Sequence, residues 1–145
     1  MPLAVQVHPD MKLIWVKGIG VVSDDDLEKY VDEYLVRRGL RDYGEVFDLS
    51  HADLLDLTYL GLSRVAAAAA PPDPEDTPTR IAILVSEAVD VGISRMYQTL
   101  RETKGGRRNL RIFRDLPPLK AWMELPEELA PEEFVGPDGG TPIRP

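Results

Sequence analysis

Residues 45–66 read EVFDLSHADLLDLTYLGLSRVA, and this stretch decides the fold. The short apolar run Glu45–Leu49 predicts a buried strand that carries an aspartate, Asp48, near its end. The aspartate-rich segment Ser50–Leu57 predicts a loop. Thr58 has the side chain of a helix N-cap, and the helix that it opens runs into Ala66–Ala70, a run of the best helix former. A strand, a loop and a helix in this order are typical of an α/β sheet.

The residues upstream predict two strands and a helix. Leu3–His8 alternates apolar and polar residues, and Lys12–Lys17 is rich in branched and aromatic residues, so the short turn between them predicts an antiparallel hairpin. Ser23 and Asp26 resemble a capping box. One apolar stripe at helical spacing then predicts a helix that ends at Gly39; its members are Leu27, Tyr30, Val31, Tyr34 and Leu35.

The residues downstream continue the alternation of strand and helix. The prolines in residues 71–78 predict an extended link, and Arg80–Val85 predicts a buried strand. Ser86 is the expected cap of a third helix, whose inner stripe includes Ile93, Met96, Tyr97 and Leu100. Gly105–Gly106 should end this helix, and Asn109–Phe113 predicts the last strand.

A short helix, Leu116–Met123, is expected to close the domain at residue 124. Residues 125–145 are rich in acid, proline and glycine, which predicts a flexible tail. The predicted fold class is therefore α/β, with a mixed, mostly parallel sheet of about five strands and about four helices.

Composition excludes several classes of function. The chain has no cysteine, which excludes disulfides, thiolate metal sites and a cysteine nucleophile. Its net charge of −8 opposes binding to nucleic acid or to an anionic membrane surface. The longest apolar runs, Val65–Ala70 and Ile81–Val85, fall far short of the ~20 residues of a membrane span. Because the first residues do not resemble a signal peptide, we expect a cytoplasmic protein.

The pattern of residues 3–123 resembles the STAS domain of bacterial anti-sigma-factor antagonists. It is more similar still to small bacterial STAS-like proteins that also resemble CRAL-TRIO lipid-transfer domains. In a STAS domain a buried strand ends in Asp, and Asp-Ser-Ser/Thr-Gly-Leu opens the next helix. Asp48 matches the first feature, and Asp56, Thr58 and Leu60 match three positions of the second. GISRMYQTL, Gly92–Leu100, is similar to the third helix of the group.

Two departures limit what the resemblance implies about function. Leu57 stands where the antagonists carry the serine that is phosphorylated, and Tyr59 replaces the motif glycine. The kinase-driven switch therefore does not carry over. Thr58 offers a hydroxyl one position later, but its expected role is the N-cap.

The leading hypothesis is a non-enzymatic binding or regulatory module that contacts a protein partner through the loop and the helix start at Ser50–Gly61. Ligands of open α/β sheets gather where parallel strands end, and helix starts offer free N–H groups. The candidate partner-binding residues are Ser50, His51, Asp56, Thr58 and Tyr59. Ser50, His51, Asp53 and Asp56 could also supply a general base or a metal ligand, but neighbours on one short loop rarely converge, so a solvated turn is the preferred interpretation.

The alternative hypothesis is a carrier of a small apolar or lipid-like molecule in a pocket between helices and sheet. Its candidate residues are Trp15, Tyr34, Met96 and Tyr97, for which plain core is the preferred interpretation, because aromatic residues at helical spacing usually pack in the core. The Ala66–Ala70 run could be a homodimer contact or an ordinary surface helix. A basic stretch could hold a phosphate, line a solvated edge strand or receive the acidic tail; its members are Arg101, Lys104, Arg107, Arg108, Arg111 and Arg114. An enzyme ranks third, and no motif predicts a cofactor or a metal.

Overall fold

The centre of the molecule is a five-stranded sheet. The computed structural model describes residues 2–70, 79–103 and 109–129. The strands follow the order β1-β2-β4-β6-β7, with bounds β1 Leu3–His8, β2 Leu13–Gly18, β4 Gly44–Asp48, β6 Arg80–Leu84 and β7 Asn109–Phe113. β1 is antiparallel to β2, and the other three pairs are parallel. The predicted mixed, mostly parallel sheet is therefore confirmed.

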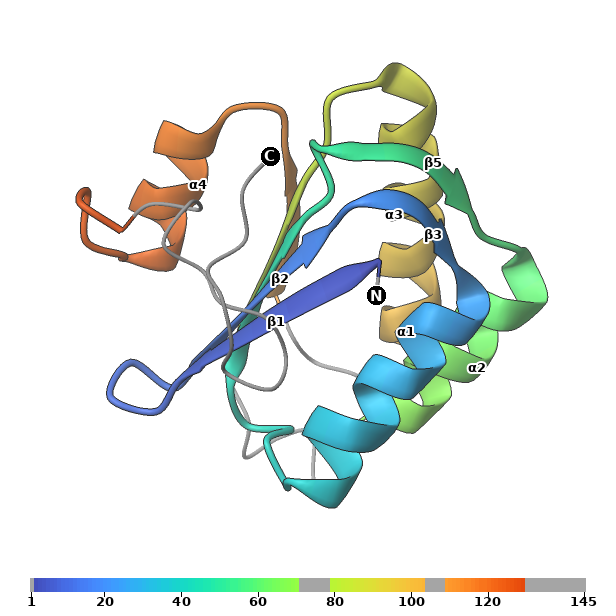
Figure 1. The fold of residues 1–145 in the computed structure, drawn as a ribbon, viewed down its shortest axis with the longest axis horizontal. Helices are drawn as coiled ribbons and strands as arrows, with labels where there is room; N and C mark the ends of the chain where they lie inside the picture. Colours follow the sequence, from blue (N-terminus) through green and yellow to red (C-terminus); the bar gives the residue numbers. More distant parts are fainter. Residues whose placement is uncertain (1, 71–78, 104–108, 130–145) are drawn as a thin grey trace.

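Helices cover both faces of this sheet (Figure 1). Helix α1 (Asp24–Tyr30), which continues as the π-helical η1 (Val31–Arg37), lies with α2 (Tyr59–Ala69) and α3 (Ala88–Thr103) on one face. Helix α4 (Leu116–Met123) lies on the other face, where Leu119 is buried. Successive residues of a strand point to opposite faces, so Ile14 packs under the three helices while its neighbour Trp15 packs under α4.

A second, two-stranded sheet lies beside the first and corrects the predicted loop. β3 (Gly20–Ser23) and β5 (Ala52–Asp56) pair in parallel, so most of the segment that was expected to be a loop is a strand. Gly20 has φ +70°, and the strand register shifts between Gly20 and Val21, because Asp53 is an extra residue on the β5 side of the pair. The upper right of Figure 1 shows this pair, hereafter the ribbon, leading into α1 and α2.

Two of the predicted helix starts, those capped by Ser23 and Thr58, are confirmed. Ser23 and Asp26 form the expected capping box, in which the Ser23 backbone N–H donates to Asp26 Oδ2 at 2.9 Å. Thr58 caps α2, because its Oγ1 accepts from the Gly61 N–H at 3.0 Å. Helix α3 begins at Ala88, two residues after the expected cap, and the π-helical segment was not predicted.

Several predictions fall outside the described residues. These are the extended link at 71–78, the glycine pair at 105–106 and the tail beyond Leu129. At the start of the tail, Leu125 and Leu129 pack against the apolar cluster under α4. No helix within the described ranges is long and apolar enough to cross a membrane.

Candidate functional site

One carboxylate holds the starts of α1 and α2 together. Asp24, in the first turn of α1, accepts from the Thr58 backbone N–H at 3.0 Å and from Thr58 Oγ1 at 2.6 Å. Its negative charge therefore lies at the positive end of α2, where it is stabilised. A Cβ atom at Gly61 would overlap the Asp24 carboxylate, so this contact requires glycine at residue 61. We refer to Asp24, Thr58 and Gly61 as the clasp.

The ribbon carries apolar residues on both of its sides. On the inner side Val22 pairs with Leu55, and both side chains are buried in the core. On the outer side Val21 pairs with Leu54, and these side chains are 51% and 57% exposed. A sheet with one solvated face normally carries polar residues there, so the outer pair needs an explanation.

The exposed apolar side chains of the described chain concentrate at this place. Five large apolar residues are exposed, and four of them lie on the ribbon or in the first turn of α2, into which β5 leads; the four are Val21, Leu54, Tyr59 and Leu60. We refer to these four as the apolar patch. The fifth, Val36, lies on η1. Clustered exposed apolar residues commonly mark a binding surface, whereas single ones need no explanation.

The candidate partner-binding residues separate into two groups. Asp56, Thr58 and Tyr59 are exposed beside or within the apolar patch. Ser50 and His51 instead form a turn after β4: Ser50 Oγ donates to Asp48 Oδ1 at 2.6 Å, and His51 Nδ1 lies 3.2 Å from Ser50 Oγ.

This turn does not have the arrangement of a catalytic triad. In a triad the histidine lies between the nucleophile and the acid, and here the serine lies between them. The Ser50 backbone N–H also donates to Asp48 Oδ1 at 3.2 Å, which is the bond of an Asx turn. No group of three metal-ligating side chains occurs in the part of the chain that the structure describes.

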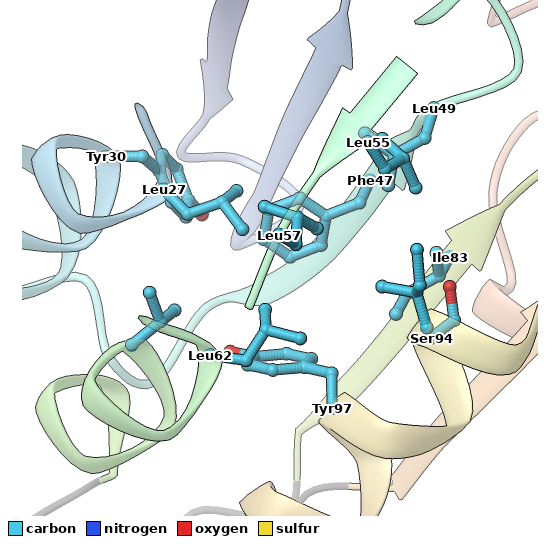
Figure 2. A pocket seen from close by; sticks show the side chains of 12 residues that line it. Leu27, Tyr30, Phe47, Leu49, Leu55, Leu57, Leu62, Ile83, Ser94 and Tyr97 are labelled. Atoms are coloured by element: carbon cyan, nitrogen blue, oxygen red, sulfur yellow. The ribbon is translucent and has the colours of Figure 1, made fainter. Parts of the chain in front are cut away.

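Directly beneath β5 lies a small apolar pocket of about 40 Å³. Its walls come from the sheet, from all three helices of this face and from the segment between β5 and α2 (Figure 2). The lining residues are Leu27, Tyr30, Phe47, Leu49, Leu55, Leu57, Leu62, Val65, Ile83, Ile93, Ser94 and Tyr97. Leu55 and Leu57 face the pocket while their neighbours Leu54 and Asp56 are exposed, so one segment forms both the pocket wall and the surface.

Of the predicted pocket residues, Tyr97 alone lines this pocket. Trp15 is buried on the opposite face of the sheet, in the cluster under α4, because its position in β2 points it away from the three helices. Tyr34 is buried in the correct layer and stacks on Tyr30, with ring centroids 5.6 Å apart. Met96 is partly buried against the same core. The predicted set of four therefore does not form one site.

Two tyrosines of the pocket wall reach buried charges with their hydroxyl groups. Tyr30 Oη donates to Glu45 Oε1 at 2.7 Å, and Arg101 Nη1 donates to Tyr97 Oη at 2.8 Å. Arg101 is 2% exposed, which corrects its expected place in a solvated basic stretch. Burial acts to lower the pKa of Arg101, but Tyr97 and Glu45 outweigh it and raise this pKa, so the guanidinium stays charged.

The other predicted surfaces are only partly described. In the basic stretch Arg111 and Arg114 are exposed, and Arg114 Nη2 donates to the Ser86 carbonyl at 2.8 Å; residues 104, 107 and 108 lie outside the described ranges. In the alanine run Ala66 and Ala69 are buried in the core, while Ala67 and Ala68 are exposed. The homodimer contact stays a prediction.

Val21, Leu54 and Leu60 were not predicted as surface residues. For Val21 and Leu54 the sequence holds a signal, because Val21-Val22 and Leu54-Leu55 are adjacent apolar pairs. In a strand such a pair must place one member on each side, so two doublets that align in a ribbon give a buried and an exposed apolar pair.

Comparison with known proteins supports the fold. No protein-family description matches the sequence, and no curated protein matches it. Among solved structures, the chain is similar to an uncharacterised protein of the DUF3478 family from Shewanella loihica PV-4, which is described as having a SpoIIAA-like fold. The TM-score is 0.54 at 12% sequence identity, over 83% of this chain and 91% of that one. The chain therefore has the STAS-like, SpoIIAA-like α/β fold that its sequence pattern implied.

Proposed function

We propose that this chain is a non-enzymatic regulatory module of the bacterial cytoplasm that binds a protein partner through the apolar patch. The observation that carries the proposal is the concentration of four of the five exposed large apolar side chains on the ribbon and the start of α2. Leaving such side chains in water forfeits about 25 cal/mol for each Å² of apolar surface that a partner could cover.

The geometry of the ribbon supports a fixed surface rather than a flexible loop. The outer pair Val21 and Leu54 is held in register by the inner pair, which is part of the core. The clasp fixes the first turn of α2, which carries Tyr59 and Leu60, against α1. Preorganised side chains lose little conformational entropy when a partner binds.

Site-specific photo-cross-linking in the cells that make the protein tests the proposal. A photoreactive amino acid replaces Tyr59 in one variant and Val36 in the other, since both positions are exposed and apolar. We expect a discrete cross-linked protein from position 59 and none, or a different set, from position 36. The same products from both positions would overturn the proposal.

The pocket favours a second function, the binding of a small apolar molecule. Its walls are apolar apart from Ser94 and the tyrosine hydroxyls. Pockets that enclose drug-sized ligands measure about 300–1,000 Å³, so the volume of about 40 Å³ requires a wall to move before a lipid-sized molecule enters. The segment between β5 and α2, which contributes Leu57, is a part of the wall that belongs to neither a helix nor the five-stranded sheet.

Native mass spectrometry of the purified chain tests this second function. We expect an added mass that is lost on denaturation and is absent from Ser94→Leu, which fills the pocket. The bare mass of the chain, in preparations made under mild conditions, would count against a carrier.

A further inference from the structure

The acidic border of the apolar patch identifies the chemistry of the partner. Residues 19–28, which contain β3 and the start of α1, hold four acidic residues and no lysine or arginine. Residues 50–63, which contain β5 and the start of α2, hold two acidic residues and again no lysine or arginine. Within these bounds each segment carries acidic residues alone, and the exposed cations Lys29 and Arg64 follow directly after them.

The exposed acids of β5 are not neutralised by neighbours. Asp53 and Asp56 are exposed and form no ion pair within the described ranges. Some acidic residues elsewhere on the surface have basic partners, as in Asp32 with Arg37 at 3.0 Å and Glu33 with Arg38 at 3.2 Å. Others, such as the exposed Asp10, form no ion pair within the described ranges either. At the edge of this region Asp25 pairs with Lys29 at 3.0 Å, and its hydrogen bond raises the pKa of Lys29.

From this distribution we infer that the patch binds a basic protein segment, with lysine or arginine side chains against Asp53 and Asp56 and apolar side chains against Val21 and Leu54. This inference rests on the proposed function and adds the class of partner. Opposite charges at the border of an interface select the partner and speed its association.

The same charges disfavour the other occupants. A second copy of this chain would bring Asp53 and Asp56 close to like charges, and each copy carries a net charge of −8. Nucleic acid and anionic lipid are repelled for the same reason. A partner segment that carried only apolar residues would leave Asp53 and Asp56 without oppositely charged side chains across the interface.

Nuclear magnetic resonance with two matched synthetic peptides tests the inference on the full chain. One peptide alternates leucine with lysine, and the other alternates leucine with glutamate at the same length. We expect the lysine peptide to shift the backbone amide signals of β3, β5 and the first turn of α2. Its affinity should fall at least about fivefold between about 50 mM and about 500 mM salt, because screening weakens exposed ion pairs. The glutamate peptide should leave these signals unchanged.

Two variants with matched controls assign the effect to the named residues. Asp53→Asn with Asp56→Asn should remove most of the salt dependence, whereas Asp10→Asn, an exposed aspartate in the β1–β2 turn, should retain it. Leu54→Ser should weaken the lysine peptide at all salt concentrations, and Val36→Ser should not. Equal binding of both peptides, binding of the lysine peptide elsewhere, or no binding of it overturns the inference.

The outcome for the partner class is separable from the outcome for the proposed function. A protein that cross-links at position 59 and whose contact segment lacks lysine and arginine would keep the docking surface and overturn the basic partner. Concentration-dependent dimerisation through the patch, or binding to anionic vesicles through it, would likewise exclude a basic partner.

Discussion

The inner and the outer side of the ribbon are built from the same residue types and have opposite environments. Val22 and Leu55 are 0% and 6% exposed, while Val21 and Leu54, one residue away in each strand, are 51% and 57% exposed. The inner pair completes the core under α1 and α2. We expect the outer pair to contribute little to folding, so the comparison separates apolar residues of the core from those that we propose to contact a partner.

The largest expected effect comes from breaking the inner side. Leu55→Ala should lower the free energy of unfolding by about 2–5 kcal/mol, because it leaves a cavity beside the existing pocket. Urea denaturation followed by circular dichroism measures the change. A loss below about 1 kcal/mol would show that the ribbon is not part of the cooperative core.

The clasp provides the next effect, because it fixes where the patch lies. Gly61→Ala should cost about 1–3 kcal/mol of unfolding free energy, since the new methyl group displaces Asp24 from its hydrogen bonds with Thr58. In an Asp24→Ala background the same substitution should be neutral or stabilise by up to about 1 kcal/mol, because alanine favours the helix over glycine.

A double-mutant cycle over these two positions measures their coupling. Additive effects of Asp24→Ala and Gly61→Ala would mean that the glycine is not required by the carboxylate.

The helix cap gives a smaller effect. Thr58→Ala should cost about 0.5–2 kcal/mol, because it removes the N-cap bond from the Gly61 N–H and the hydroxyl bond to Asp24. Thr58→Ser should restore most of this loss, because the serine hydroxyl can form both bonds. Thermal melting compares the three proteins. Equal destabilisation by serine and alanine would assign the effect to the methyl group of threonine rather than to its hydroxyl.

These substitutions also mark what the sequence could predict. Thr58 and the Ser23–Asp26 capping box were found from sequence because their partners lie three residues away. β5 was not found, because its strand geometry depends on β3, about thirty residues earlier in the chain, and its aspartates favour a loop. The burial of Arg101 was missed for the same reason: its partner charge Glu45 lies on a distant strand, and nothing in a run of basic residues marks one of them as buried.

The candidate site shows the same division between local and distant information. Asp56, Thr58 and Tyr59 were proposed from their position after a strand, and the structure leaves them exposed. Trp15 was assigned to the wrong face, because which face of the sheet the three helices cover is decided by packing between distant elements. To predict that Val21 and Leu54 form an exposed pair, the register between β3 and β5 would have been required as well.

The smallest expected effect on stability is on the outer side, and it is the most informative. Leu54→Ser should change the free energy of unfolding by no more than about 0.5 kcal/mol, because a side chain that is 57% exposed loses few contacts when it is shortened. The same variant should abolish most of the cross-link from position 59, since it removes one of the two apolar side chains on the outer side of the ribbon. Leu55→Ala should have the opposite pattern of effects. It should lower the free energy of unfolding, but under conditions in which the variant stays folded it should retain the cross-link from position 59. Val36→Ser should change neither the free energy of unfolding nor the cross-link, because Val36 is exposed like Leu54 but lies on η1, outside the apolar patch. If Leu54→Ser instead destabilised the fold by more than about 1 kcal/mol, both sides of the ribbon would serve folding. The exposure of Leu54 would then no longer support a partner-binding role for the apolar patch.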